Sequence, residues 1–190
     1  VVTERAAYLA KADLLTGMVG EFPELQGVMG RYYARYDDES AAVAEAIEQH
    51  YWPRFAGDAL PLSNEAAAVA LADRLYSLAG MFGIGQQPTG EKDPFGLRRA
   101  ALGLIRIVIE KDLPLKLDEL VDLAFSVFPD SHGQAHTDVE GFIIDRLSGY
   151  LRDSGATAQE VEAVLARGTR ALAETPKVLK AVQDFQRMPE

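Results

Sequence analysis

Apolar residues recur every three or four positions along most of the chain, which places them on one face of an α-helix. No stretch of useful length alternates apolar and polar residues as a half-buried strand would. The predicted helices cover residues 4–15, 22–36, 40–51, 66–78, 94–111 and 117–128, with three more beginning near 137, 157 and 175. The sequence therefore predicts an all-α fold.

Short turn signals separate these helices. Gly80, Gly83 and Gly85 are expected to end the helix over 66–78, because glycine tolerates backbone angles that other residues resist. Asp93 followed by Pro94 predicts the start of the next helix, with an acceptor side chain before a residue already set to helical φ.

Further signals divide the second half. Residues 137–140 (TDVE) and 157–160 (TAQE) match the capping-box pattern, and Thr175-Pro176 predicts a last helix start. The step from Asp112 to Pro114 is a candidate boundary. We predict one helical domain over 1–112 and a smaller helical region over 113–190.

Composition narrows the possible partners. The 190 residues carry a net charge of −10, which argues against nucleic-acid binding over the whole surface. Residues 91–116 instead hold six basic and four acidic side chains, so a contact with a polyanion should be local. Cysteine is absent, which fits a reducing cytoplasm, and no apolar run is long enough to predict a membrane partner. There is no initiator methionine, and we expect the chain to be part of a longer protein.

Two arginines are candidates for that local contact. Arg99 and Arg106 fall on one face of the predicted helix with Gly103 between them, so a shallow strip could accept successive phosphates. The neighbouring apolar face is expected to hold this helix against the core, and its members are Leu97, Ala101, Leu104, Ile105 and Val108. The alternative is that both arginines form ion pairs inside the chain, Arg106 with Glu110 and Arg99 with an acid such as Asp73 or Glu21.

The glycine-rich loop nearly spells a phosphate-binding motif. Gly85 and Gly90 have the required spacing, but Glu91 stands where the motif needs lysine. Pro88 also removes a backbone N–H that such a loop uses as a donor. We therefore predict a structural turn.

The histidines give no convincing metal site. His132 and His136 are four residues apart, which on a helix would suit a metal, but a polar connector over 130–136 predicts a solvated loop instead. His50 lies at a predicted helix end, where its ordinary role is to favour the helix C-terminus.

Asp13 and Asp73 each stand within an apolar helical segment, where an unpaired carboxylate is costly. They could be metal ligands or acid–base groups. The structural alternative pairs them with Lys11, Arg74, Arg98 or backbone donors, and we favour it because no histidine accompanies them.

Several strings together resemble the β subunit of the bacterial tetrameric glycyl-tRNA synthetase. They are KADL at 11–14, MVGEF at 18–22, QGVMG at 26–30, HY at 50–51, PRFAGD at 53–58, LP at 60–61, ALADRL at 70–75, FGIGQ at 82–86, KDPF at 92–95 and LRRAALG at 97–103. The resemblance continues more weakly through EAVLAR at 162–167 and covers essentially the whole chain.

This resemblance implies an α2β2 enzyme that joins glycine to its tRNA with ATP and magnesium. The aminoacylation site would lie in the α subunit, while the β subunit would mainly engage tRNA. The chain would hold an HD-like helical domain and a helical connector, without the family's anticodon-binding domain and without a cofactor of its own. The candidate tRNA contacts are Arg99, Arg106, Arg98 and Lys92.

The HD-like resemblance also implies a degenerate metal site. HD hydrolases hold a metal with a His-Asp doublet and a distant aspartate, but the doublet position here is Ala12-Asp13, and Asp73 matches the distant acid. The family's further aspartate after that acid is replaced in the string from Asp73 to Ser77. We expect no bound metal.

The leading hypothesis is therefore a tRNA-binding and scaffolding part of a ligase, inactive alone and cytoplasmic, with the α subunit, a second β subunit and glycine tRNA as partners. The alternatives are a metal-dependent phosphohydrolase of the HD class and a purely structural helical module.

Overall fold

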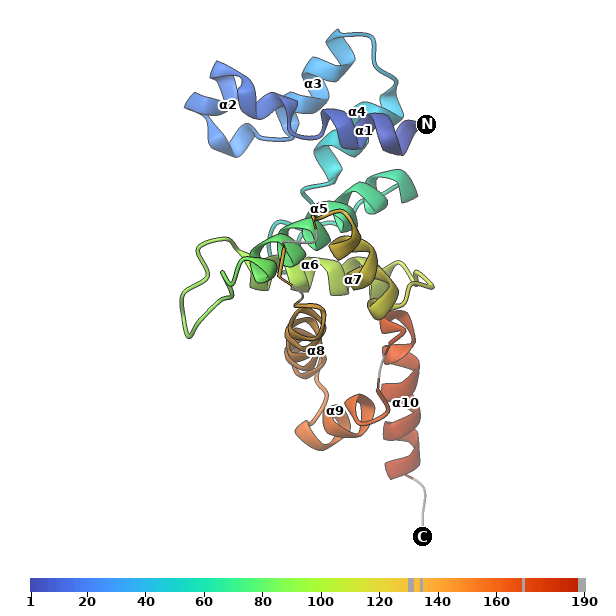
Figure 1. The fold of residues 1–190 in the computed structure, drawn as a ribbon. Coiled ribbons are helices and arrows are strands. Elements are labelled where there is room, and N and C mark those ends of the chain that lie inside the picture. Colours follow the sequence, from blue (N-terminus) through green and yellow to red (C-terminus); the bar gives the residue numbers. More distant parts are fainter. Residues whose placement is uncertain (130–131, 134, 169, 188–190) are drawn as a thin grey trace. The chain divides into compact units, whose positions relative to one another are not determined.

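A computed structural model describes residues 1–129, 132–133, 135–168 and 170–187 (Figure 1). These residues form helices joined by turns, with isolated β-bridges at Thr89–Lys92 and Lys116–Ala171 and no strands among them. The predicted all-α class is confirmed. No helix in these described ranges has the length and apolar character needed to cross a membrane.

The chain packs as two compact units, residues 1–73 and 74–190. The boundary falls inside helix α5 (Asn64–Gly83), so one continuous helix contributes residues to both units. The sequence predicted a domain boundary after residue 112, which differs from the boundary between these two compact units, and that domain assignment stays a prediction.

The first unit contains α1 (Val2–Leu9), α2 (Gly17–Glu21), α3 (Val28–Tyr36) and α4 (Ala41–Gln49), together with the start of α5. Alanine dominates its core, and these small side chains allow close packing of the helices. The buried cluster consists of Ala6, Ala10, Ala34, Val43, Ala44, Ala46, Ile47, Ala66 and Val69.

Two helices predicted in the first unit are interrupted. The predicted helix over 4–15 ends at Leu9, and a separate 3-10 helix covers Ala12–Leu15. The predicted helix over 22–36 is likewise a 3-10 helix (Pro23–Leu25) followed by α3. Between them Gly27 has a φ of 78°, and a Cβ there would lie 2.5 Å from Tyr51 Cδ2, so the chain turns sharply where no side chain fits.

The second unit is built around α6 (Leu97–Glu110), which packs against α8 (His136–Asp153) and a 3-10 helix (Leu172–Glu174). α7 (Leu117–Ser126) also packs on α8. α9 (Ala158–Leu165) packs against both α8 and α10 (Thr175–Gln186). The predicted apolar face of α6 is confirmed as core. Its members are at most 1 % exposed: Leu97, Ala101, Leu104, Ile105 and Val108.

Helix α5 continues past Gly80, one of three glycines that were predicted to end it, and ends at the second, Gly83. A Cβ at Gly80 would lie 3.2 Å from Phe128 Cζ, and one at Gly83 would overlap the ring of His132. These glycines therefore admit side chains from residues about fifty positions further along the chain. The prediction that Gly80 breaks the helix was wrong, whereas the helix does end at Gly83, with Gly85 at a φ of 73° just beyond it.

The predicted helix starts have mixed outcomes. The capping box of α9 is confirmed, with Thr157 Oγ1 accepting from Glu160 N at 3.3 Å and Glu160 Oε2 accepting from Thr157 N at 2.7 Å. α10 begins at Thr175 with proline in its first turn, as predicted. The box predicted at Thr137 does not form, because α8 already begins at His136, whose ring stacks on Phe125 at 4.0 Å.

Candidate functional site

The start of α6 fixes the geometry of the basic segment. Asp93 accepts hydrogen bonds from Leu97 N at 2.8 Å and from Arg98 N at 2.9 Å, which satisfies two first-turn donors. The helix itself begins three residues later than predicted, because Gly96 occupies the N-cap position with a φ of 66°. Asp93 thus caps the helix with its side chain, as predicted, but it lies three residues before the N-cap position at Gly96.

The loop before α6 is held as a turn. Thr89 and Lys92 exchange two backbone hydrogen bonds, of 3.2 and 2.9 Å, and the guanidinium of Arg98 donates to the carbonyl of Gly90. Gly85 and Gly90 both have positive φ values. These contacts agree with the structural turn predicted for this loop. One candidate tRNA contact, Arg98, has its guanidinium bonded within the turn.

Arg106 has an acidic partner inside the chain. Its Nε lies 2.7 Å from Glu110 Oε1 and its Nη2 lies 3.3 Å from Oε2, and its side chain is 13 % exposed. Gly103 is buried, and a Cβ there would lie 2.5 Å from Nε of Arg74. The side chain of Arg74 therefore covers Gly103, so the shallow strip predicted between Arg99 and Arg106 does not exist.

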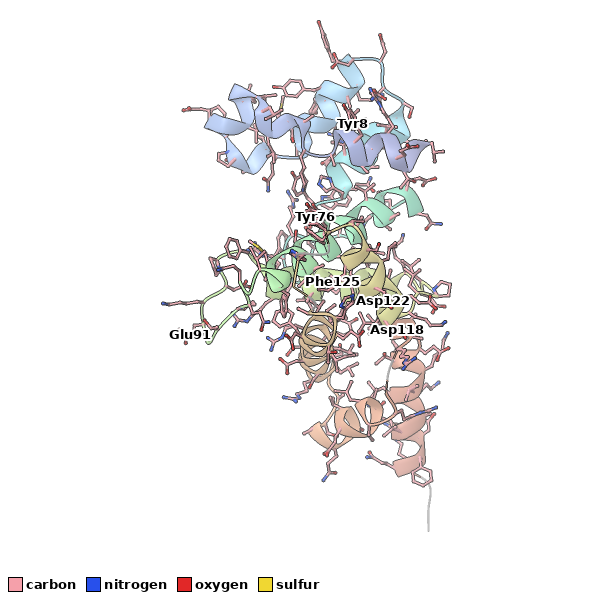
Figure 2. All side chains as sticks on the ribbon, in the orientation of Figure 1. Tyr8, Tyr76, Glu91, Asp118, Asp122 and Phe125 are labelled. Atoms are coloured by element: carbon pink, nitrogen blue, oxygen red, sulfur yellow. The ribbon has the colours of Figure 1, made fainter. Side chains whose placement is uncertain are left out.

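Lys92 and Arg99 differ from the other two candidates. Both side chains are exposed, and within the described residues neither has a hydrogen-bond or ion-pair partner. The guanidinium of Arg99 folds back toward the start of its own helix, where a Cβ on Gly96 would lie 3.2 Å from Nη2. Of the four candidate tRNA contacts, two are thus available cations and two are used internally. Glu91 lies near the tip of the same loop (Figure 2).

Comparison with known proteins decides the family. The family model described as glycyl-tRNA synthetase beta subunit matches residues 1–166. The chain belongs to this family. It is 58 % identical over 188 residues to the glycine–tRNA ligase beta subunit of Thiobacillus denitrificans, covering 98 % of this chain and 27 % of that protein. It is 59 % identical over 186 residues to the same subunit of Polaromonas naphthalenivorans, covering 98 % of this chain and 26 % of the relative. The chain therefore spans about a quarter of the length of these curated relatives.

In this member of the glycyl-tRNA synthetase β-subunit family, the buried carboxylate of Asp13 accepts hydrogen bonds from backbone amides. The residue is 2 % exposed, and its Oδ2 accepts from Gly27 N at 2.6 Å and Gly30 N at 3.1 Å, the amides that open α3. A carboxylate at a helix N-terminus is favoured by the orphan donors and by the helix dipole. Ala12, the other half of the doublet, lines a pocket of about 350 Å³ together with Asp13.

Asp73 is paired with a cation from the chain itself. Lys11 Nζ lies 3.1 Å from Asp73 Oδ1 and 2.9 Å from Nε2 of His50, and 4.2 Å from the centre of the Tyr51 ring. His50 is fully buried, with its Nδ1 2.6 Å from the Ile47 carbonyl. Because a carbonyl only accepts, Nδ1 carries the proton and Nε2 accepts from the lysine. Both aspartates have the partners that the structural alternative named.

Tyr51 has a raised pKa in this cluster. Burial chiefly raises the pKa of its hydroxyl, and the carboxylates of Asp13 and Asp73 raise it further. The phenol is therefore neutral across the physiological range. Among the described residues, no group of three or more His, Cys, Asp or Glu side chains is arranged to hold a metal ion.

Several contacts lay beyond what the sequence could indicate. Lys11 and His50 meet across 39 positions, and nothing local in the sequence marks that pair. The prediction that His132 and His136 lie in a solvated loop was wrong: both are partly buried, and His132 stacks on Phe128 at 4.3 Å with its Nε2 3.1 Å from the Ala79 carbonyl. Residues 130, 131 and 134 of that predicted connector lie outside the described residues.

Proposed function

We propose that this chain is a tRNA-binding and scaffolding part of the β subunit of a glycine–tRNA ligase, without catalytic activity of its own. Family membership supports this, since the matching relatives are β subunits of glycine–tRNA ligase. The aminoacylation chemistry, with ATP and magnesium, belongs in this proposal to the α subunit. The assembly is α2β2, works in the cytoplasm and contains a second β subunit.

The observation that carries the RNA contact is the pair of exposed cations, Lys92 and Arg99. The chain as a whole has a net charge of −10, so a polyanion is repelled by most of it. An ion pair inside the chain would neutralise a cation, as Glu110 does for Arg106. Lys92 and Arg99 keep their charge available to phosphate, and the planar fork of arginine matches phosphate oxygens.

The first unit supports a scaffolding role over hydrolysis. In the phosphohydrolase alternative a metal would need lone pairs of Asp73 and its neighbours. Here the ammonium of Lys11 lies against Asp73 and against Nε2 of His50. Asp13 directs one oxygen to two backbone donors of α3. The residues at the degenerate HD positions thus hold helices together.

The test is the salt dependence of tRNA binding by the ligase assembled from both subunits, comparing Lys92→Ala and Arg99→Ala with the wild type. Loss of one phosphate contact should weaken binding and make the slope of log K against log salt shallower by about one unit. Arg35→Ala is the matched control, because it removes an exposed arginine from α3 in the other unit.

Unchanged affinity and slope for both variants, with wild-type stability, would support the purely structural module instead. A loss equal to that of Arg35→Ala would show only a general effect of net charge. Arg98→Ala and Arg106→Ala are expected to lower stability, because their side chains bond to Gly90 and Glu110.

A further inference from the structure

The second unit has a small apolar pocket beside the basic segment. Its volume is about 320 Å³, and its lining combines α5 with the residues on either side of Gly96. The lining residues are Tyr76, Ser77, Gly80, Met81, Phe95 and Leu97. This volume lies at the lower end of the range of roughly 300–1,000 Å³ that small-molecule pockets occupy, which suits one small planar group.

Two aromatic rings at this pocket remain open to solvent. Tyr76 is 58 % exposed and Phe95 is 49 % exposed, whereas Leu97 at the same pocket is 1 % exposed and forms part of the core. Tyr76 is labelled in Figure 2. Its ring stacks on Phe128 with centroids 4.8 Å apart and an angle of 23° between the planes. This contact holds the tyrosine ring in one orientation, so a ligand would meet a pre-oriented aromatic surface.

Positive charge lies at the edge of the same pocket. Gly96 stands between Phe95 and Leu97, and the position of a Cβ on Gly96 is 3.2 Å from Nη2 of Arg99. The guanidinium is thus close to the backbone that forms one wall. Aromatic surfaces next to an available arginine are the combination that binds an unstacked base together with its phosphate.

We propose that this pocket binds a single unpaired nucleobase of the RNA, stacked against Tyr76 and Phe95, with the adjoining phosphate on Arg99. The proposal rests on the proposed function and adds the kind of nucleotide that the site takes. An apolar side chain of a protein partner would fill the pocket equally well, but it would leave the neighbouring arginine without an anionic partner. A nucleotide supplies both the ring and the charge.

The experiment measures tRNA affinity and its salt slope for the ligase assembled from both subunits. Tyr76→Leu and Phe95→Leu keep apolar volume but remove the π-face, while Tyr76→Phe and Phe95→Tyr keep it. Each leucine variant should weaken binding roughly tenfold, since stacking of one base contributes that order of affinity. The salt slope should stay at the wild-type value, because no phosphate contact is lost. The ring-conserving variants should bind like the wild type.

Wild-type affinity of both leucine variants would overturn the stacking proposal, while a shallower slope in Arg99→Ala would leave the proposed function standing. A leucine variant that weakens association of the two subunits, measured by sedimentation without tRNA, would also overturn it and assign the pocket to a protein segment. Photo-crosslinking of a tRNA transcript containing 5-iodouridine to Tyr76 in the wild type, lost in Tyr76→Leu, would support it directly.

Discussion

The contact between Gly103 and Arg74 gives the sharpest test of the second unit. Replacing Gly103 by alanine places a Cβ 2.5 Å from Nε and 3.3 Å from Cζ of Arg74. The first distance is shorter than real Cβ contacts and the second is tighter than most of them, so the arginine must move. Arg74 is only 7 % exposed, and its charged group has little room to move without losing its present surroundings.

Two opposite effects set the magnitude. Alanine is favoured over glycine inside a helix by about 1 kcal/mol. Displacing a buried charged group from its partners costs about 3–5 kcal/mol. The second effect is larger, so Gly103→Ala should lower the free energy of unfolding by about 2–4 kcal/mol. A larger residue such as leucine should lower it further, because it also overfills the core.

The assay is urea denaturation, with Gly149→Ala in α8 as the matched control. Nothing lies within 4 Å of a Cβ at Gly149, so this change should raise stability by roughly 0.5–1 kcal/mol. The double variant Arg74→Ala/Gly103→Ala removes the clash, and the two substitutions should be strongly non-additive. Stabilisation of Gly103→Ala to the level of the control, or strict additivity, would refute the reasoning.

Three more predictions concern buried or capping carboxylates. Asp93→Ala should cost about 1 kcal/mol in urea denaturation by removing the cap of α6, and Asp93→Asn, which keeps an acceptor, should cost clearly less. Asp13→Ala should cost about 2–4 kcal/mol, since two amides at the start of α3 lose their acceptor, with Asp13→Asn again milder. The pKa of Glu160 is held below its ordinary 4.5, mainly by the backbone N–H of Thr157. The contribution of the Glu160 carboxylate to the free energy of unfolding is therefore complete above pH 4.5 and is lost as the pH falls through the lower, folded-state pKa. The difference in stability between wild type and Glu160→Gln should therefore close on acidification. A difference that does not depend on pH would contradict this.

The sequence predicted well what local chemistry determines. The apolar face of α6 follows from helical periodicity alone, and the structure buries all five of its predicted members. The box at Thr157 depends on residues three apart, so it too can be identified locally. The family could be identified because strings that resemble it are spread along the whole chain.

The failures depend on residues distant in sequence. The helix runs past Gly80 to Gly83, where Phe128 and His132 pack against the two glycines, and no window around these residues contains that information. The helix predicted over 4–15 ends at Leu9, and Asp13 lies in the separate 3-10 helix that follows, where its carboxylate accepts from the distant amides of Gly27 and Gly30. At the candidate site, exposure separated Lys92 and Arg99 from Arg98 and Arg106, which the sequence had grouped together.

The docking of His132 onto the end of α5 has a consequence for the folding kinetics of the second unit. Gly133 N donates to the Gly83 carbonyl at 3.1 Å, and His132 Nε2 meets the carbonyl of Ala79 at 3.1 Å. These bonds close a loop on the order of fifty residues, and the entropy of closing it must be lost before the contact stabilises anything. α6 and α7 lie within that loop and gain their hydrogen bonds locally, so they form without it. Contacts absent from the folding transition state chiefly govern how fast a native protein unfolds. The contact that Gly83 admits thus forms late in folding, and it affects the lifetime of the folded unit more than the speed of its formation.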